Sequence, residues 1–551
     1  MWYKKLFFYG CIGVVVGVIG AMALTRPQPL LAQSFAQQPG FPRFEPRNTI
    51  TFGSPSVVDI DGDGELDILL PDGNGCVWAW DNTGHVLPHY PLETGGSCNA
   101  TPRISGPLAT GDMDGDGEPE IAAGTRGTGD GVGERGRVFV WHGDGAVVNG
   151  WPQEMAWNTQ YGSGLPEVLS VAMANLTGDA RLELIAGTSN NSSAGGTPDD
   201  PTHNLYAYRA DGTVMSGFPT QYRRAGIWGF VGAADLNGDG YAEILTGRDH
   251  AFVHAYNTQG AALPAWPVAS LVDPAQPNGL YLEFTRDAPT MGDIDNDGVI
   301  EIVIAGKVRD PNQNRAVVGS AILVLQPNGQ REPGWTVAKM GGAPLYDDYF
   351  PTQSPALGDL DGDGDLEIVV GLLDGTMRAY RPDGSLLWQY NFAQGHRLFA
   401  SEPVMGDVSG DGQVDVVFGT YSPDGSDDAL ARLIGLNGTG HMLEGFPLPL
   451  DREGGAAKKG LRAAPTLADL DRDCDVEILA GSQAGVLYVW TLPAPYRATL
   501  MPWPTARHDF QRTGFYAAAA NLMPFTSLGN MSLTGERIFL PLTPNDAGVA
   551  C

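Results

Sequence analysis

The sequence predicts an all-β protein, a β-propeller of eight blades with four antiparallel strands in each blade. Three observations predict this fold. An Asp-rich motif occurs eight times at an average spacing of about 59 residues, a period typical of repeat architectures. Each motif is followed by the same succession of short strands and turns. The chain is long, at 551 residues, and its 75 Gly and 41 Pro are expected where turns join many short strands.

The repeated unit is built around the Asp-rich motif, whose first copy is Asp59-Ile-Asp-Gly-Asp-Gly-Glu-Leu-Asp67. A short strand precedes the motif, and an aliphatic strand ending at Gly follows it, as in Glu301-Ile-Val-Ile-Ala-Gly306. In most units a third strand ends in an aromatic residue such as Trp80 and leads into a turn. A fourth segment then reaches an aromatic residue, usually before Pro, as in Trp151-Pro152. Four short strands per unit, repeated radially, predict a propeller blade.

The number of units predicts eight blades, or seven if one unit is irregular. Gly40-Phe41-Pro42 precedes the first motif and Trp503-Pro504 follows the last, so we expect the two chain ends to complete the ring together. A closing strand, not a catalytic element, is expected around His508. A linear stack of β-units is the less favoured alternative, because four-stranded blades favour closure. The propeller is assigned to residues 33–515, followed by a C-terminal tail over 516–551.

Residues 1–32 have the pattern of an export signal. Lys4 and Lys5 precede an apolar run from Leu6 to Leu24, and a candidate cleavage site follows Ala32. The run is also long enough for an uncleaved anchor. The segment is therefore a signal peptide or an N-terminal membrane anchor. Both interpretations predict a secreted or cell-surface protein, and the second adds attachment to the membrane.

Charge and cysteine content exclude several classes of protein. The formal net charge of −31 argues against nucleic acid as a partner, because nothing offsets repulsion from phosphates. Five cysteines are too few for a disulfide scaffold and lack zinc-binding spacing. Cys76 and Cys98 lie in one repeat unit, and the sequence leaves open whether they pair.

The chemistry of the motif predicts calcium (Ca2+), one ion per loop. Acidic residues at positions 1, 3 and 5 direct alternate carboxylates toward one centre, Gly at position 6 permits a sharp bend, and an acid at position 9 closes the shell. An EF-hand is excluded because position 12 is never acidic and position 10 is always aliphatic, so each loop leads into a strand. Eight matching copies also argue against simple Asp-Gly turns.

The predicted calcium ligands are the residues at positions 1, 3, 5 and 9. Five loops have four acids each: Asp59, Asp61, Asp63, Asp67; Asp112, Asp114, Asp116, Glu120; Asp293, Asp295, Asp297, Glu301; Asp359, Asp361, Asp363, Glu367; and Asp469, Asp471, Asp473, Glu477. Two loops have three acids and one neutral oxygen donor: Asp235, Asn237, Asp239, Glu243; and Asp407, Ser409, Asp411, Asp415. The third loop in the chain has two acids and is expected to bind weakly or to stay empty: Asn175, Thr177, Asp179, Glu183. Four carboxylates in one loop repel each other without a cation.

Pro289-Thr-Met-Gly-Asp-Ile-Asp-Asn-Asp-Gly-Val-Ile-Glu-Ile302 and its copies resemble FG-GAP/VCBS repeats, which form the N-terminal propeller of integrin α subunits and occur in many bacterial surface proteins. Phe52-Gly53-Ser54-Pro55 is the closest approach to the motif that names the family. The resemblance covers roughly residues 40–515. It implies a propeller whose loops bind calcium at the positions given above. Integrin propellers differ in having seven blades and fewer filled loops.

Blade connectivity places the Asp-rich loops and the Gly turns on one face, and the longer, irregular connections on the other. Binding residues tend to lie on variable loops over a rigid scaffold. The opposite face is rich in aromatic and basic residues, which suit glycans, anionic polymers or a protein partner. The predicted ligand-binding residues there are Arg223, Arg224, Trp228, Arg286, Tyr346, Tyr349, Arg397 and Arg462.

The leading hypothesis for function is a non-catalytic, calcium-stabilised extracellular binding or adhesion module. It would recognise a glycan or an extracellular protein through the face opposite the calcium loops. The alternative is a calcium-dependent polysaccharide lyase of the rhamnogalacturonan type, a class that also has eight blades and repeated Asp-rich loops. The sequence identifies no catalytic base for proton abstraction.

Overall fold

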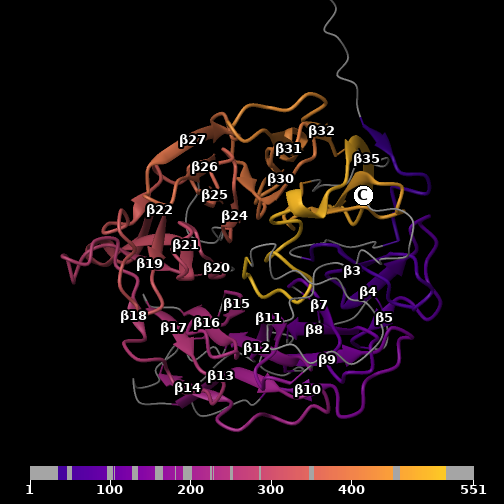
Figure 1. Ribbon diagram of the computed structural model, residues 1–551, viewed down its shortest axis with the longest axis horizontal. Helices are drawn as coiled ribbons and strands as arrows, with labels where there is room; N and C mark the ends of the chain where they lie inside the picture. Colours follow the sequence, from indigo (N-terminus) through magenta and orange to yellow (C-terminus); the bar gives the residue numbers. More distant parts are fainter. Residues whose placement is uncertain are drawn as a thin grey trace, which may run out of the picture.

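Eight antiparallel sheets are arranged radially around one axis in the computed structural model of the protein (Figure 1). We number them blades 1 to 8 in the order of their Asp-rich loops. The prediction of eight blades is confirmed, and the alternatives of seven blades or a linear stack are wrong. The structure describes residues 35–45, 53–95, 98, 103–104, 106–126, 135–155, 166–179, 181–189, 201–223, 226–227, 229–248, 252–284, 287–345, 353–450 and 460–516.

Blades 1 to 4 follow the predicted order of strands from the axis outward. Their strands are β2 (Ser56–Val58), β3 (Asp67–Pro71), β4 (Cys76–Trp80) and β5 (Leu92–Glu93) in blade 1; β6 (Arg103–Ile104), β7 (Ala109–Gly111), β8 (Glu120–Arg126), β9 (Arg137–Trp141) and β10 (Gln153–Glu154) in blade 2; β11 (Glu167–Ala174), β12 (Glu183–Ser189), β13 (Pro201–Tyr208) and β14 (Thr220–Arg223) in blade 3; and β15 (Val231–Ala234), β16 (Glu243–Arg248), β17 (Phe252–Tyr256) and β18 (Val268–Ala269) in blade 4.

Blades 5 to 8 repeat this order. Their elements are β19 (Tyr281–Glu283), β20 (Thr290–Gly292), β21 (Glu301–Asp310), η1 (Pro311–Gln313), β22 (Ala316–Leu325) and β23 (Lys339–Met340) in blade 5; β24 (Ala356–Gly358), β25 (Glu367–Gly371), β26 (Thr376–Tyr380) and β27 (Leu386–Asn391) in blade 6; β28 (Phe399–Ala400), β29 (Val404–Gly406), β30 (Asp415–Tyr421), η2 (Asp428–Leu430), β31 (Arg432–Leu436) and β32 (Leu448–Pro449) in blade 7; and β33 (Thr466–Ala468), β34 (Asp475–Gly481) and β35 (Leu487–Pro495) in blade 8, followed by η3 (Ala498–Leu500). In blades 2, 5 and 7 two short strands share the innermost place.

The fourth strand of blade 8 comes from the other end of the chain. β1 (Ala36–Gln37) pairs antiparallel with β35, with Ala36 opposite Thr491 and Gln37 opposite Trp490. This pairing confirms that the two ends of the chain complete the ring together. Within blade 1, Cys76 is disulfide-bonded to Cys98, so the pairing that the sequence left open is formed.

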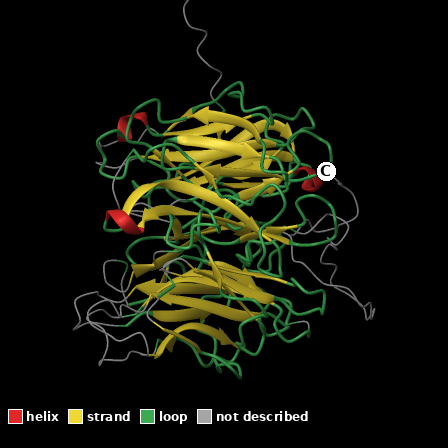
Figure 2. Cartoon of the chain, turned by 90° about the vertical axis from the view of Figure 1, so that its left-hand side faces the viewer, coloured by secondary structure: helices red, strands yellow, loops and turns green. Residues whose placement is uncertain are grey.

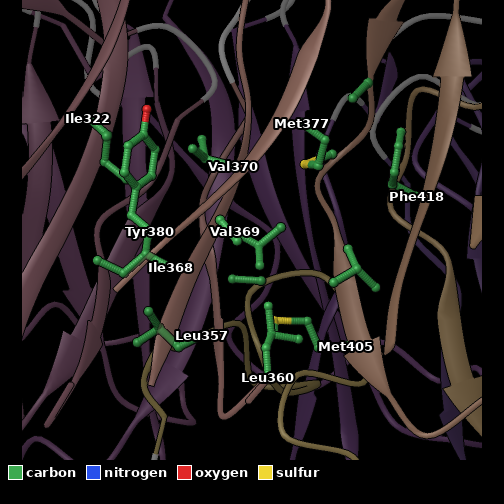
Figure 3. Close-up of a cluster of buried hydrophobic side chains, with 14 of the residues drawn as sticks. Ile322, Leu357, Leu360, Ile368, Val369, Val370, Met377, Tyr380, Met405 and Phe418 are labelled. Carbon is green, nitrogen blue, oxygen red and sulfur yellow. The ribbon is translucent and has the colours of Figure 1, made fainter. Parts of the chain in front are cut away.

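The hydrophobic core lies between the faces of neighbouring blades. In the cluster of Figure 3, Ile322 of blade 5 packs with Ile368 and Val370 of blade 6, and Phe418 comes from blade 7. All four side chains are 0% exposed. Each sheet is therefore covered on both faces, which explains why the second strands are continuous aliphatic runs instead of alternating ones.

The aromatic residues of the fourth segments join each blade to the next. The indole Nε1 of Trp151 donates to the Ala210 carbonyl (2.7 Å), and that of Trp266 donates to the Pro327 carbonyl (2.8 Å). The equivalent bonds of blades 5 and 6 run from Trp335 to Pro382 and from Trp388 to Gly438. A bulky ring with one polar atom suits this place, because it fills the junction and bonds to a turn of the neighbouring blade.

Residues 500–516, which we call the channel segment, line the inside of the ring (Figure 1, yellow). Its carbonyl oxygens accept hydrogen bonds from backbone N–H groups in the innermost strands of six blades. In each of these blades the donor is the residue two places before the Asp-rich loop. The donors are Thr110, Met173, Ala233, Met291, Met405 and Leu467, and the acceptors are Phe510, Gln511, Thr513, Gly514, Trp503 and Pro504 in the same order. These N–H groups lie on strand edges that would otherwise be unpaired in a buried channel.

Small residues in the innermost strands make room for the channel segment. A Cβ added to Gly358 would lie 2.9 Å from Pro502 Cγ, and one added to Gly232 would lie 3.2 Å from the Thr513 carbonyl oxygen. The segment around His508 is therefore not the closing strand expected from the sequence. It fills the channel, where His508 is 3% exposed and contacts the ring of Trp503.

Arg512 anchors the channel segment to the ring. Its guanidinium donates to the Leu108 carbonyl (2.7 Å), to Ser56 Oγ (2.7 Å) and to the Ala506 carbonyl (2.8 Å). The side chain is buried at 1% exposure. The five donors of an Arg side chain can be satisfied in such a site only by several converging acceptors.

None of the helices within the described residues is long and apolar enough to cross a membrane. The predicted signal peptide or anchor over 1–32 and nearly all of the tail over 516–551 lie outside those residues.

We predict that Arg512→Met lowers the free energy of unfolding by about 3–5 kcal/mol, because it leaves buried acceptors without a donor. Chemical denaturation in excess calcium measures the change. Arg103→Met, at an exposed position of β6, is the control and is expected to change stability by no more than about 0.5 kcal/mol. Equal stability of the two variants would show that the channel segment does not hold the ring.

Candidate metal centres in the Asp-rich loops

The ninth residue of every Asp-rich loop folds back over the start of the loop. Its carboxylate accepts a hydrogen bond from the N–H of the second residue in all eight loops, at 2.8 to 3.1 Å. Strand pairing sets this geometry, because the ninth residue always lies opposite the residue just before the loop, as Glu367 lies opposite Gly358. The buried acid is therefore positioned by the sheet and not by the loop alone.

The first and fifth residues shape the loop itself. In blade 6, the carboxylate of Asp359 accepts from the N–H groups of Gly362 (2.7 Å) and Gly364 (3.1 Å). The carboxylate of Asp363 accepts from the N–H of Asp365 (3.0 Å), and the same bond from position 7 to position 5 occurs in all eight loops. These bonds turn the backbone N–H groups toward the acids and so fix the orientation of the carboxylates.

The bend of the loop needs two residues with positive φ, at positions 4 and 6. Gly362 and Gly364 have φ of 78° and 96°, respectively. Position 6 was predicted from the sequence, and Cys474, which replaces Gly there in blade 8, has φ of 72° as expected for a strained bend. Position 4 was missed, although Gly stands there in six of the eight motifs. Its two exceptions, Asn296 and Arg472, also have positive φ.

Four loops contain a buried carboxylate oxygen without a hydrogen-bond partner. The ninth residues of blades 5 to 8 each have one such oxygen, and their side chains are at most 1% exposed: Glu301 Oε1, Glu367 Oε1, Asp415 Oδ1 and Glu477 Oε1. A buried charge without a partner is costly. Burial, together with the nearby acids, raises the pKa of these groups to about 8, 7, 7 and 9, respectively.

Ligand atoms converge within the span of a single cation in several loops. The carboxylates of Asp359, Asp361 and Glu367 each offer an oxygen, and these oxygens lie within 4.8 Å of one another. Asp59, Asp61 and Asp67 form the equivalent group in blade 1. A set of oxygen donors on a bent loop, with an orphaned oxygen buried at its base, fits a hard divalent cation. The absence of a rigid octahedral cage favours calcium over magnesium.

The loops of blades 3 and 4 satisfy their own acids. In blade 3, Thr177 Oγ1 donates to Glu183 Oε1 (3.0 Å), so both oxygens of Glu183 have partners. In blade 4, Asn237 Nδ2 donates to Glu243 Oε1 (2.7 Å). These neutral donors supply hydrogen bonds to carboxylate oxygens that a cation would otherwise contact. This arrangement is consistent with the weak cation site expected in blade 3. By the same reasoning, we expect the loop of blade 4 to bind a cation less tightly than the loops without such a donor.

The predicted ligand-binding residues lie mostly outside the part of the chain that the structure describes. Arg224, Trp228, Arg286, Tyr346 and Tyr349 are outside it, and Arg223 is described only as backbone at the end of β14. Two residues can be placed. Arg397 is exposed and donates from Nη1 to Asp424 Oδ2 (2.9 Å), and the guanidinium of Arg462 lies over the ring of Tyr421 at 5.4 Å.

A basic cluster on the face opposite the Asp-rich loops was missed in the sequence. The strands β21 and β22 are 10 residues each, twice the length of β25 and β26, and form a long hairpin toward that face. Glu283 of β19 is buried against three cations of this hairpin: Arg309 (2.7 Å), Arg315 (2.9 Å) and Lys307 (3.9 Å). These cations hold the pKa of Glu283 below its usual value despite burial, which acts in the opposite sense.

Figure 2 shows the blades from the side, with the strands running between two faces that hold the turns and loops. The Asp-rich loops join first to second strands and the Gly turns join third to fourth strands, so both lie on one face. The hairpin turn between β21 and β22 lies on the other face.

Comparison with protein families finds the FG-GAP-like repeat at residues 59–123 and 359–418. The chain therefore contains FG-GAP-like repeats within an eight-bladed β-propeller. The two matched stretches include the Asp-rich loops of blades 1, 2, 6 and 7. A search of curated proteins gives no match.

Solved structures with a similar fold come from proteins of different kinds. Saccharomyces cerevisiae Sqt1 is 11% identical, with a TM-score of 0.48, and the match covers 84% of this chain and 100% of that chain. Bacillus licheniformis rhamnogalacturonan lyase PL11 is 13% identical, with a TM-score of 0.44, over 88% of this chain and 97% of that chain. The V. cholerae biofilm matrix protein Bap1 is 14% identical, with a TM-score of 0.39, over 89% and 98%.

We predict that the cation-free protein loses stability as pH rises from about 5 to 9. The folded-state pKa of the ninth acids is raised above the unfolded value, so their contribution is fully present below about pH 4.5 and is lost as pH rises through about 7 to 9. Thermal melts in excess chelator at several pH values measure the effect. A melting temperature that rises over this range would contradict the prediction.

Proposed function

We propose that the protein is a calcium-stabilised extracellular binding module whose ligand, a glycan or a protein, docks on the face opposite the Asp-rich loops. The observation that carries the calcium part is the buried, unpartnered oxygen of the ninth acid in four loops. A cation at each of these loops would supply the missing partner and neutralise the crowded carboxylates. The proposal also includes export of the chain, as the N-terminal sequence predicts.

The ions have a structural role in this proposal. Each loop joins the innermost strand of a blade to the second strand, and the ninth acid lies in the second strand. A bound cation would therefore hold two strands in register. The loops lie at the ends of strands far from the basic hairpin, which leaves the other face for recognition.

The basic cluster around Glu283 favours an acidic glycan among the two classes of ligand. Three cations, Lys307, Arg309 and Arg315, gather around Glu283 in a chain whose net charge is −31. Arg315 remains 46% exposed at its side chain, and its Nε donates to the hydroxyl of Tyr281 (2.8 Å). An exposed guanidinium can bind the carboxylate of an acidic sugar through two parallel hydrogen bonds.

We predict opposite effects of Glu367→Gln in the two metal states. In excess chelator the variant is at least as stable as the parent, because it removes a buried charge. In saturating calcium the variant is less stable than the parent by about 2.7 kcal/mol, which is the linkage contribution of one site at a hundred times its Kd. Calorimetric melts with and without calcium measure both effects.

Glu183→Gln is the matched control, since the same acid in blade 3 is bonded to Thr177. Its melting temperature is expected to respond to calcium as the parent's does. If calcium leaves the melting temperature of the parent unchanged, the proposed role of the loops is wrong.

We predict that the protein is retarded by polygalacturonate in affinity electrophoresis and that Arg315→Glu weakens the retardation about fivefold or more, because it reverses an exposed charge in the basic cluster. Arg181→Glu, the same change on the opposite face, is the control. Equal retardation of both variants would show that the basic hairpin does not bind the acidic glycan. The same incubations are monitored for the ultraviolet absorbance of unsaturated sugars, whose appearance would favour the polysaccharide lyase over a binding module.

A further inference from the structure

In blades 2 and 6 the residue that follows the third strand lies beside the Asp-rich loop of its own blade. In blade 6 this residue is Arg381, whose Nη2 lies 3.1 Å from Asp361 Oδ2, at position 3 of the loop. In blade 2 the same place is taken by His142, whose Nδ1 lies 3.1 Å from Glu120 Oε1, at position 9. The other blades have Asp81, Arg209, Asn257, Gln326, Asn437 and Thr491 there, so blade 2 alone brings an imidazole to its loop.

The imidazole and two carboxylates of blade 2 converge on one point. One ligand atom each from Asp114, Glu120 and His142 lie within 4.8 Å of one another. Glu120 is buried at 1% exposure and is fixed by the N–H of Met113 (2.8 Å), whereas the His142 side chain is 37% exposed. A fixed carboxylate at the base and a solvent-accessible imidazole at the rim form a site that an ion can enter from solvent.

This set of donors differs chemically from those of the other loops. Calcium takes oxygen ligands, whereas imidazole nitrogen is a good ligand for zinc and the first-row transition metals. Imidazole suits zinc, copper, iron and nickel, and carboxylate and water suit manganese, so one His and two carboxylates with further positions open to water can hold a divalent transition metal. Asp112 and Asp116 form a second group with Asp114 in the same loop and offer further oxygen ligands nearby.

We propose that the blade 2 loop is a site for a divalent transition metal, with Asp114, Glu120 and His142 as protein ligands, in a chain whose other loops with three or four acids take calcium. This inference rests on the proposed cation-binding role of the loops and deepens it by assigning a different class of ion to one of them. The bond between His142 and Glu120 is then the metal-free arrangement of two ligands, and the imidazole turns its nitrogen to the ion when the ion binds.

The test uses the full chain without an affinity tag, stripped of metal and then saturated with calcium. Cobalt(II) is the probe, because its visible absorption reports coordination by nitrogen and oxygen. We expect one equivalent of cobalt(II) to bind in the presence of excess calcium and to be displaced by zinc. His142→Asn, which installs the residue that blades 4 and 7 have at this place, is expected to weaken this binding at least tenfold.

Arg381→His in blade 6 is the matched gain-of-site variant. It places an imidazole beside a loop with four acids, and we expect it to bind a second equivalent of cobalt(II). Unchanged cobalt binding by His142→Asn would overturn the assignment, as would the absence of cobalt binding by the parent. The calcium-dependent melting temperature is recorded in parallel: if it persists while cobalt binding fails, only the blade 2 assignment is wrong, and if it is absent, the proposed role of all the loops fails.

Discussion

The bond from the N–H of the second loop residue to the carboxylate of the ninth is the interaction on which the blades depend. It occurs in all eight loops and joins the exit of the innermost strand to the entry of the second strand. It also draws one carboxylate per blade out of water, where the charged form is disfavoured. The same bond that keeps each sheet regular therefore buries a carboxylate that is more stable with a cation or hydrogen-bond donors beside it. Thr177 and Asn237 donate to this carboxylate in blades 3 and 4, and His142 contacts it in blade 2.

Much of the fold was predictable because the same local rules are repeated. The period of the motif, the aliphatic strand after it and the aromatic residue before Pro were sufficient for eight blades and for closure by both chain ends. The bent, acid-rich loops were also predictable, because carboxylates at alternate places have a recognisable spacing, and calcium binding at these positions stays a prediction. What the sequence does not reveal is which acids keep a free oxygen. That depends on partners such as Thr177, whose hydroxyl reaches Glu183 only in the folded loop.

The channel segment and the basic hairpin were not predicted, for two different reasons. The channel segment has no period of its own, and its role follows from the ring, where six innermost strands present the same N–H group to the axis. A segment that occurs only once in the chain cannot be recognised by comparing repeats with one another. The hairpin was seen as a long, irregular connection, whereas ten-residue strands extend it and bring Arg309 and Arg315 to Glu283.

Closure by β1 has a consequence for how the chain reaches its final form. Ala36 pairs with Thr491, so the first described strand has no partner in its sheet until nearly the whole chain has been made. The channel segment follows even later in the sequence, so the N–H groups that the innermost strands of six blades donate to it have no acceptor there before it is made. Neighbouring blades can pack against each other as they are synthesised, but the ring cannot close until residues 487–516 have been made. Completion of the ring therefore brings segments that are far apart in the sequence together last.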